Sequence, residues 1–222
     1  MRRWPKPLRA SCERPAVRPL VSDVRRIALT GGIATGKSHV RAAFEALGVP
    51  TIDSDLLARD AVAPGTSGLA AVIERFGRGI LDATGQLDRH KLGQIVFADP
   101  AARRALEAIV HPHVQRATEA WFTRVNSRSH PFAIADIPLL YEVGRDRDFD
   151  KVIVVACDPR TQLARLIQRD GISEDEARQR LDAQLPIADK VRRADYVIRT
   201  DGSHEDTDKQ VQEILRMLGG GC

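Results

Sequence analysis

The stretch GGIATGKS, residues 31–38, constrains the fold of this chain more than any other feature. It fits the pattern G-x-x-x-x-G-K-[ST], in which a glycine-rich loop turns backbone N–H groups inward around phosphate groups. The segment 25–30 before it is a short apolar run typical of a buried strand, and residues 37–48 after it have apolar side chains at helical spacing. This order of strand, loop and helix predicts a nucleotide-binding α/β domain with a parallel sheet.

Four positions of this loop have defined chemical roles. Gly31 and Gly36 occupy the fixed glycine places, where a backbone without side chains can curl around an anion. Lys37 is expected to reach the β- and γ-phosphates of a nucleoside triphosphate, and the Ser38 hydroxyl is expected to bind Mg²⁺. The helix that begins near Lys37 adds the positive end of its dipole. The loop therefore predicts a nucleoside triphosphate but does not identify the acceptor.

Beyond the loop, the pattern predicts a sheet core and a separate helical part. Nearly all of residues 55–128 follow a helical pattern, which we interpret as an insertion between strands. Further apolar strands are expected at 49–53, 132–140, 151–158 and 195–200. We therefore expect a three-layer α/β/α fold with a parallel sheet core. The expected limits are a leader at 1–24 and one domain at 25–222, made of the core 25–54 and 130–222, the insertion 55–129 and a lid at about 165–193.

The distribution of charge gives no support for a nucleic-acid partner. The chain has 34 Lys and Arg against 30 Asp and Glu, but the whole excess lies in residues 1–24. This leader has four prolines and no apolar stretch of signal-peptide length, so we expect it to be disordered or an artefact of the assigned start. No apolar run of about 18 residues predicts a membrane span. Three cysteines without disulfide or metal spacing, Cys12, Cys157 and Cys222, favour a cytoplasmic location.

Such loops occur in several classes of protein, and the remaining sequence narrows them. A signalling GTPase needs an Asn-Lys-x-Asp motif to bind guanine, and the only asparagine, Asn126, stands in VNSRS. A motor or helicase is normally larger and carries a second motif that we do not find. A small kinase remains, because such enzymes combine the loop with an acceptor-binding segment and a mobile, arginine-bearing lid.

Carboxylates at the ends of predicted strands are the candidates for catalysis. Asp53 and Asp55 stand two apart at the end of a strand, which would place both side chains on one face at the ligand-binding edge of the sheet. One of them is expected to accept the proton of an attacking hydroxyl, although Asp53 or Ser54 could instead cap the next helix. Asp136 follows an apolar strand and is either a ligand of Mg²⁺ or an ordinary strand-end carboxylate.

Basic side chains in the second half of the chain are candidates for stabilising charge during phosphoryl transfer. Arg165 and Arg169 are four apart on one helix face, and Arg165 is the first choice. The alternative is a solvated face with acidic partners. A second basic cluster follows at Lys190, Arg192 and Arg193. His111 precedes Pro112 within a helical pattern, where we expect a break or kink, and a lone histidine is more often structural.

Together these segments resemble the dephospho-CoA kinase family. The resemblance runs from about Arg26 to Ser203 and rests on IALTGGIATGKS, VPTIDSDLLAR, PGTSG, FGRGILDATGQLDR, LEAIVHP, DIPLLYE, TQLARLIQRD, AQL and ADYVI. It implies transfer of the γ-phosphoryl group of ATP, with Mg²⁺, to the 3′-hydroxyl of dephospho-CoA, the last step of coenzyme A biosynthesis. It also implies a P-loop core, a helical acceptor-binding domain and a lid. The implied partner is a small molecule, and the oligomeric state stays open.

The resemblance assigns roles to individual residues. By family pattern Asp55 is the expected base, beside Lys37 and Arg165 as the charge-stabilising groups. ATP binding is expected from Gly31, Gly32, Ala34, Thr35, Gly36, Lys37, Ser38 and His39. Acceptor contacts are expected from Asp53, Arg59, His111, Leu140, Tyr141 and Glu142. The expected ligands of Mg²⁺ are Ser38 and Asp136.

Three positions depart from the family pattern. Ala34 stands in place of a usual Gly and fits only if its φ is negative. His39 replaces Thr, so its side chain must leave the adenine side open, and Thr200 replaces Asn. A related P-loop kinase for a nucleoside monophosphate or another small alcohol is the second hypothesis. A non-catalytic ATP-binding regulator or a nucleic-acid-binding protein is the third, and the presence of Asp55 speaks against it.

Overall fold

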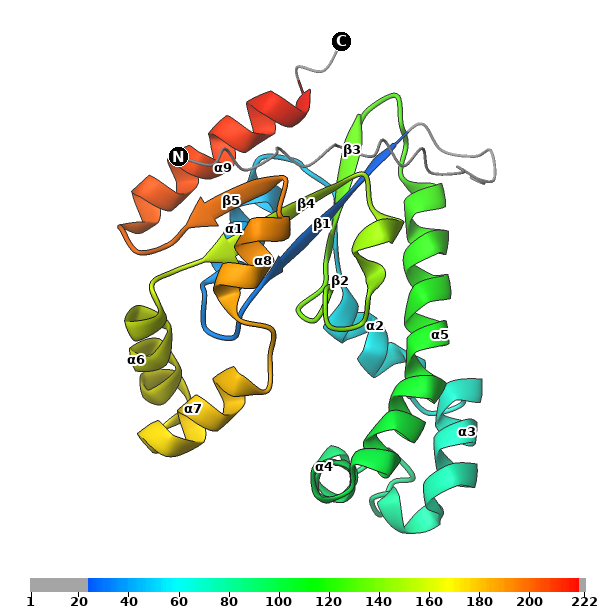
Figure 1. Ribbon diagram of the computed structural model, residues 1–222. Coiled ribbons are helices and arrows are strands. Elements are labelled where there is room, and N and C mark those ends of the chain that lie inside the picture. Colours follow the sequence, from blue (N-terminus) through cyan, green and yellow to red (C-terminus); the bar gives the residue numbers. More distant parts are fainter. Residues whose placement is uncertain (1–23, 220–222) are drawn as a thin grey trace, which may run out of the picture.

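The computed structural model describes residues 24–219, which form one five-stranded parallel sheet with surrounding helices (Figure 1). The predicted leader lies outside these residues except for Val24, which is buried. The strands are β1 (Arg25–Gly31), β2 (Thr51–Asp53), β3 (Phe132–Asp136), β4 (Lys151–Ala156) and β5 (Tyr196–Arg199). Their order is β2-β3-β1-β4-β5, so the strand before the phosphate loop is central. Strands β2 and β3 lie on one side of β1, and β4 and β5 lie on the other, so the connection from β3 to β4 passes β1. Open α/β sheets bind ligands beside the strand at which the order changes sides in this way.

Helices cover the sheet and extend beyond it. The α-helices are α1 (Lys37–Ala46), α2 (Ser54–Ala61), α3 (Ser67–Phe76), α4 (Arg89–Ala98), α5 (Pro100–Arg124), α6 (Pro159–Asp170), α7 (Glu174–Asp182), α8 (Ile187–Arg193) and α9 (His204–Gly219). Two short 3₁₀ helices are η1 (Arg78–Ile80) and η2 (Arg145–Asp148). Between residues 24 and 219, no helix combines the length and the apolar character needed to cross a membrane.

The sheet is buried on both faces, as parallel sheets usually are. On one face, Ile27 and Leu29 of β1 share a hydrophobic cluster with buried residues of α1 and α9. On the other face, Ala28 of β1 clusters with Phe122 of α5 and with partly buried side chains of α8. Alternate residues of β1 thus supply the two cores, because successive strand side chains point to opposite faces. The three layers confirm the predicted α/β/α fold.

A helical part with its own core projects from the sheet. Residues from α3, α4 and the chain around them form a third cluster, whose buried members are Val62, Val72, Ile80 and Leu92. Figure 1 shows α3 and α4 beside the lower end of α5, which is 25 residues long and reaches up to the sheet. These helices lie between β2 and β3 in the chain. The limits predicted for an insertion, 55–129, stay a prediction.

Helix α5 continues through Pro112, so the chain does not break beside His111. The alternative expectation, a kink at this point, stays a prediction. A proline removes one hydrogen bond and leaves the carbonyl of the residue four positions earlier, here Ala108, without its partner. Both Ala108 and Pro112 are exposed, so water can satisfy that carbonyl and the helix tolerates the proline.

The segment after β3 turns out of the sheet earlier than expected. We predicted a strand over 132–140, but β3 ends at Asp136. Pro138 has no N–H group for a sheet ladder, and its carbonyl instead accepts a hydrogen bond from Oγ1 of Thr30 at 3.1 Å. The chain therefore passes over the carboxyl end of β1, directly beside the phosphate loop.

Candidate functional site

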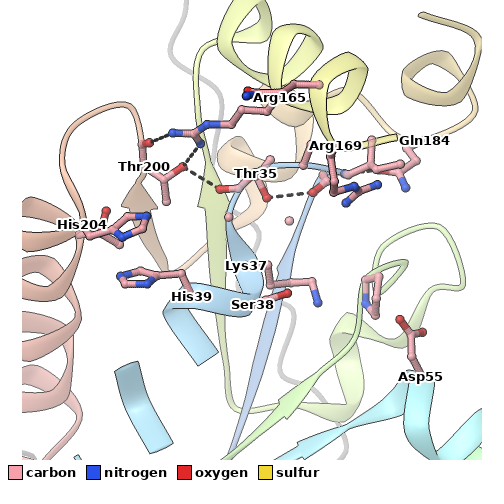
Figure 2. A pocket seen from close by; sticks show the side chains of 18 residues that line it. Thr35, Lys37, Ser38, His39, Asp55, Arg165, Arg169, Gln184, Thr200 and His204 are labelled. Atoms are coloured by element: carbon pink, nitrogen blue, oxygen red, sulfur yellow. Dashed lines mark hydrogen bonds between the residues drawn. The ribbon is translucent and has the colours of Figure 1, made fainter. Parts of the chain in front are cut away.

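The phosphate loop joins β1 to α1 and lines a cavity of about 610 Å³ (Figure 2). Residues 31–39 form one side of this cavity, and Arg165, Thr200 and His204 face them from other elements. Helix α1 begins directly after Gly36, whose φ is 85°. The N–H groups of its first turn and the positive end of its dipole therefore lie at the cavity, an arrangement that attracts phosphate.

Two glutamines from distant parts of the chain hold the loop, Gln162 in α6 and Gln184 in the connection between α7 and α8. Nε2 of Gln162 donates to the carbonyl of Ile33 at 2.7 Å, and the N–H of Ile33 donates to Oε1 of Gln184 at 3.0 Å. A Cβ atom on Gly32 would lie 2.4 Å from Nε2 of Gln162, so this contact requires glycine. Sequence analysis did not identify either glutamine as a site residue, although both stand in segments that carry the family resemblance, Gln162 in TQLARLIQRD and Gln184 in AQL.

Ala34 has a φ of 59°, so the prediction of a negative φ is wrong. The N–H of Thr35 donates to the carbonyl of Gly32, which makes Ala34 the third residue of a tight turn. A positive φ at this position is typical of type II turns and favours glycine. The turn keeps its shape with alanine because the glutamines fix Ile33 and the Thr35 hydroxyl also bonds to Gly32 O at 2.9 Å.

Replacing Ala34 by glycine is expected to stabilise the protein. The left-handed conformation costs an L-residue roughly 1–2 kcal/mol, so Ala34→Gly is expected to raise the free energy of unfolding by about 1 kcal/mol. Thermal denaturation should show a rise in Tm of ~2–4 °C for a chain of this size. Ala70→Gly is the matched control, because Ala70 is exposed inside helix α3 and its replacement should lower Tm. Equal decreases in both variants would show that the loop is not strained.

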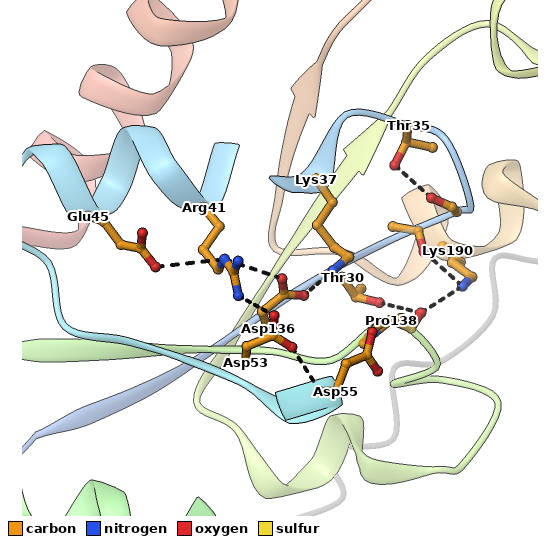
Figure 3. Close-up of polar contacts among 12 residues, drawn as sticks. Thr30, Thr35, Lys37, Arg41, Glu45, Asp53, Asp55, Asp136, Pro138 and Lys190 are labelled. Atoms are coloured by element: carbon orange, nitrogen blue, oxygen red, sulfur yellow. Dashed lines mark hydrogen bonds and ion pairs between the residues drawn. The ribbon is translucent and has the colours of Figure 1, made fainter. Parts of the chain in front are cut away.

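Lys37 forms an ion pair with Asp136 at the carboxyl end of β3 (Figure 3). Asp136 is only 2% exposed. Burial raises the pKa of its carboxyl group, although the ammonium group of Lys37 opposes this shift. Nε of Arg41 lies 3.9 Å from the same carboxylate. A phosphate bound in the loop would therefore compete with Asp136 for the Lys37 ammonium group.

Asp53 and Asp55 lie on different elements, which corrects the prediction that they share a strand face. Strand β2 ends at Asp53, and Asp55 belongs to the first turn of α2. Asp53 is the helix cap, since its Oδ1 accepts the backbone N–H of Asp55 at 2.8 Å, and it also pairs with Arg41. Burial would raise the pKa of Asp53, but these hydrogen bonds outweigh it and lower the pKa. Because Asp53 caps the helix, the side chain of Asp55 is left to face the cavities.

A second cavity, of about 410 Å³, lies beside the first. It is bounded by α2, by the middle of α5 and by the segment after β3, and its lining includes Val110, His111, Val114, Leu139, Val143 and Arg145. Asp55, Pro138 and Gln184 line both cavities. A carboxylate in this place can take a proton from a group bound in one cavity while that group attacks a phosphate bound in the other.

The other predicted acceptor residues lie outside these linings. Leu140 and Tyr141 are buried in the core, and Glu142 forms an ion pair with Lys190 at 2.7 Å. Arg59 is exposed on α2. Of the predicted acceptor set, the structure brings only His111 to a cavity lining, and the members that line neither cavity are Asp53, Arg59, Leu140, Tyr141 and Glu142.

Arg165 and the paired histidines His39 and His204 also line the first cavity (Figure 2). Arg165 donates to Oγ1 and to the carbonyl of Thr200 at 3.1 and 2.7 Å. The ring of His39 stacks on that of His204 with a centroid distance of 4.2 Å, and its Nε2 lies 2.8 Å from Oδ1 of Asp208. These contacts turn the His39 ring toward α9.

The fold and the site define a class of protein before any comparison is made. A phosphate loop at a central parallel strand, with two adjoining cavities that share an acidic residue, is the arrangement of a P-loop kinase. Comparison with known proteins then gives the family. Residues 25–206 match the family model for dephospho-CoA kinase, and the chain belongs to that family.

Relatives match the chain over most of its length. A dephospho-CoA kinase from Anaeromyxobacter dehalogenans is 48% identical over 89% of this chain and 94% of its own length. A dephospho-CoA kinase domain-containing protein from Danio rerio is 42% identical over 86% of this chain and 84% of its own length. The solved structure of a dephospho-CoA kinase from Campylobacter jejuni is similar with a TM-score of 0.68 and 28% identity, covering 88% of this chain and 98% of that chain.

Proposed function

We propose that this chain transfers the γ-phosphoryl group of ATP to the 3′-hydroxyl of the dephospho-CoA ribose, giving coenzyme A and ADP. The observation that carries this proposal is the position of Asp55, which lines both the phosphate-loop cavity and the adjoining cavity. Membership of the dephospho-CoA kinase family supports the identity of the acceptor.

We propose that ATP occupies the first cavity with its phosphates on the loop. Lys37 would contact the β- and γ-phosphates. The Ser38 hydroxyl lines the cavity and the Asp136 carboxylate lies beside Lys37, so hard oxygen donors of the kind that suit Mg²⁺ are present. A bound Mg²⁺ would supply neutralisation of the phosphate charge, held by Ser38 with Asp136 as its second protein ligand.

The acceptor is proposed to bind in the second cavity. Its apolar lining from α5 and the segment after β3 suits the long, largely uncharged arm of dephospho-CoA. His111 and Arg145 are two of the polar side chains in this lining, and both can orient a ribose or phosphate group. The acceptor hydroxyl would then lie near Asp55, facing the phosphate loop.

The proposed reaction is one in-line displacement. Asp55 accepts the hydroxyl proton as the hydroxyl oxygen forms a bond to the γ-phosphorus, and the bond from that phosphorus to the β–γ bridging oxygen breaks, so ADP leaves. Lys37 stabilises the negative charge that spreads over the transferred group. The proton on Asp55 then returns to solvent.

We further propose that α6 and α7 act as the lid. Arg165 and Arg169 of α6 already line the first cavity, and Arg165 donates a hydrogen bond to the carbonyl of Thr200 at 2.7 Å. An arginine that reaches the transferred phosphoryl group can contribute ~10³–10⁵ in rate. Helix α8 lies within the predicted lid range, 165–193, but packs against β4 and is excluded from this proposal.

The test is a coupled ADP-release assay with MgATP and a panel of acceptors. Dephospho-CoA, AMP, CMP and adenosine are offered in parallel, and turnover is expected with dephospho-CoA alone. Turnover with a nucleoside monophosphate instead would keep the kinase activity and reject the proposed acceptor. An absence of turnover with ATP binding intact would favour a non-catalytic regulator.

A further inference from the structure

Lys190 on α8 is a charged side chain with no place in the reaction described so far. Its side chain is fully buried, at 0% exposure, and it lines neither cavity. Removing an ammonium group from water is costly unless it is paired and hydrogen-bonded. The sequence pattern grouped it with Arg192 and Arg193 as a basic cluster, yet both of those are exposed.

The Lys190 ammonium group connects the two sides of the active site. Nζ lies 2.7 Å from Oε1 of Glu142. It also donates to the carbonyls of Gly31 at 3.2 Å and Pro138 at 3.4 Å (Figure 3). Gly31 is the first residue of the phosphate loop, and Pro138 lines both cavities. One cation therefore holds the nucleotide side and the acceptor side at the same time.

The chain that leads into α8 repeats this connection. Gln184 accepts the N–H of Ile33 in the phosphate loop at 3.0 Å. The next residue, Leu185, donates its N–H to the Glu142 carboxylate at 3.0 Å. Residues 184–190 thus contact two residues of the phosphate loop, Gly31 and Ile33, and two residues of the segment 138–142, Pro138 and Glu142.

We propose that Lys190 is a positioning residue that fixes the phosphate loop relative to the segment 138–142, and with it the γ-phosphoryl group relative to the acceptor hydroxyl. This inference rests on the proposed function, because it requires ATP in the first cavity and the acceptor in the second. Phosphoryl transfer needs the reacting atoms in line, and a misplacement of about 1 Å can lower the rate by ~10²-fold.

Three measurements distinguish positioning from simple stabilisation: kcat, KM and the ratio of the products. In Lys190→Met, kcat per ATP-binding molecule is expected to fall by ~10–10²-fold, while KM for ATP and for the acceptor changes by less than about threefold. Water that reaches the γ-phosphorus in the misaligned site gives ADP and inorganic phosphate. The ratio of ADP formed to phosphorylated acceptor is therefore expected to rise above the wild-type ratio.

Lys151→Met is the matched control. Lys151 also forms a lysine–carboxylate pair, with Asp195 at 2.8 Å, but its side chain is 45% exposed and lines neither cavity. This variant is expected to keep the wild-type kcat and the wild-type product ratio. A fall in kcat equal to that of Lys190→Met would reject a specific role for Lys190.

A second variant protects the test against misfolding. Lys190→Met leaves Glu142 beside an uncharged side chain, and a buried pair broken in this way is destabilising. The double variant Lys190→Met/Glu142→Gln removes both charges and should regain stability. We expect its kcat to stay low and its product ratio high. If Glu142 contacted the acceptor directly, KM for dephospho-CoA would rise instead.

One result would overturn the proposal. If either folded variant keeps kcat within about twofold of wild type and an unchanged product ratio, Lys190 contributes only stability. The wild-type rate with dephospho-CoA tests the proposed function separately. If the wild type phosphorylates another member of the acceptor panel, the same variant-to-wild-type comparison is made with that acceptor.

Discussion

Lys37→Ala is expected to lower kcat/KM for MgATP by on the order of 10³-fold or more, to the limit of detection. In the proposed reaction the ammonium group of Lys37 is the cation that the loop itself supplies to the phosphates, and alanine would leave the developing charge without it. The measurement is the coupled ADP-release assay at saturating dephospho-CoA. Turnover above about a tenth of the wild-type rate would mean that another cation takes its place, such as Arg165 or Arg169, which also line the first cavity.

The control for this variant must separate folding from chemistry. Without Lys37, the buried carboxylate of Asp136 loses its ion-pair partner, and breaking such a pair costs about 3–5 kcal/mol. Lys37→Arg keeps a cation at Asp136, so we expect near-wild-type thermal stability. We still expect low turnover, because a planar guanidinium group does not reproduce the compact ammonium group. Wild-type turnover by Lys37→Arg would show that only the charge matters.

Asp55→Asn is expected to lower kcat by ~10²-fold or more while ATP binding stays nearly unchanged. Asparagine is similar in shape but cannot take the proton of the attacking hydroxyl. The fold should survive, because Asp53 rather than Asp55 caps α2 through its side chain. The measurements are steady-state kcat and a separate titration with ATP.

Asp60→Asn is the matched control for Asp55→Asn. Asp60 is an exposed aspartate of the same helix and lines neither cavity, so its replacement is expected to leave kcat unchanged. A wild-type kcat for Asp55→Asn would exclude Asp55 as the base. A loss of ATP binding in the same variant would instead place its carboxylate in nucleotide binding.

Features with a local cause were predicted well from the sequence. The phosphate loop lies between a strand and a helix as expected, since its glycines and its strand and helix flanks are contiguous. Residues 173–176 carry the Ser-x-x-Glu pattern of a capping box, and Ser173 and Glu176 form that box at the start of α7. Predictions failed where neighbours decide the outcome. Ala34 takes a positive φ that its neighbours impose, and Pro112 stays helical because its surroundings are exposed.

The candidate site was predicted in part. The loop residues, Asp55 and Arg165 all line the first cavity, and His111 lines the second. The spacing of Asp53 and Asp55 suggested one strand face, but the strand ends between them and gives them different partners. Their proposed roles in binding and catalysis await the experiments above.

The sequence by itself determined the phosphate loop, the parallel α/β core and the family, because each is encoded in contiguous residues. Only the tertiary structure decided which polar side chains hold the loop and which charges are buried. Lys190 and Gly31 are 159 residues apart in the chain, and Gln184 and Ile33 are 151 apart. Contacts of this kind depend on how α8 packs against the sheet. A lysine on a helix has the same sequence signature whether it faces water or a buried carboxylate.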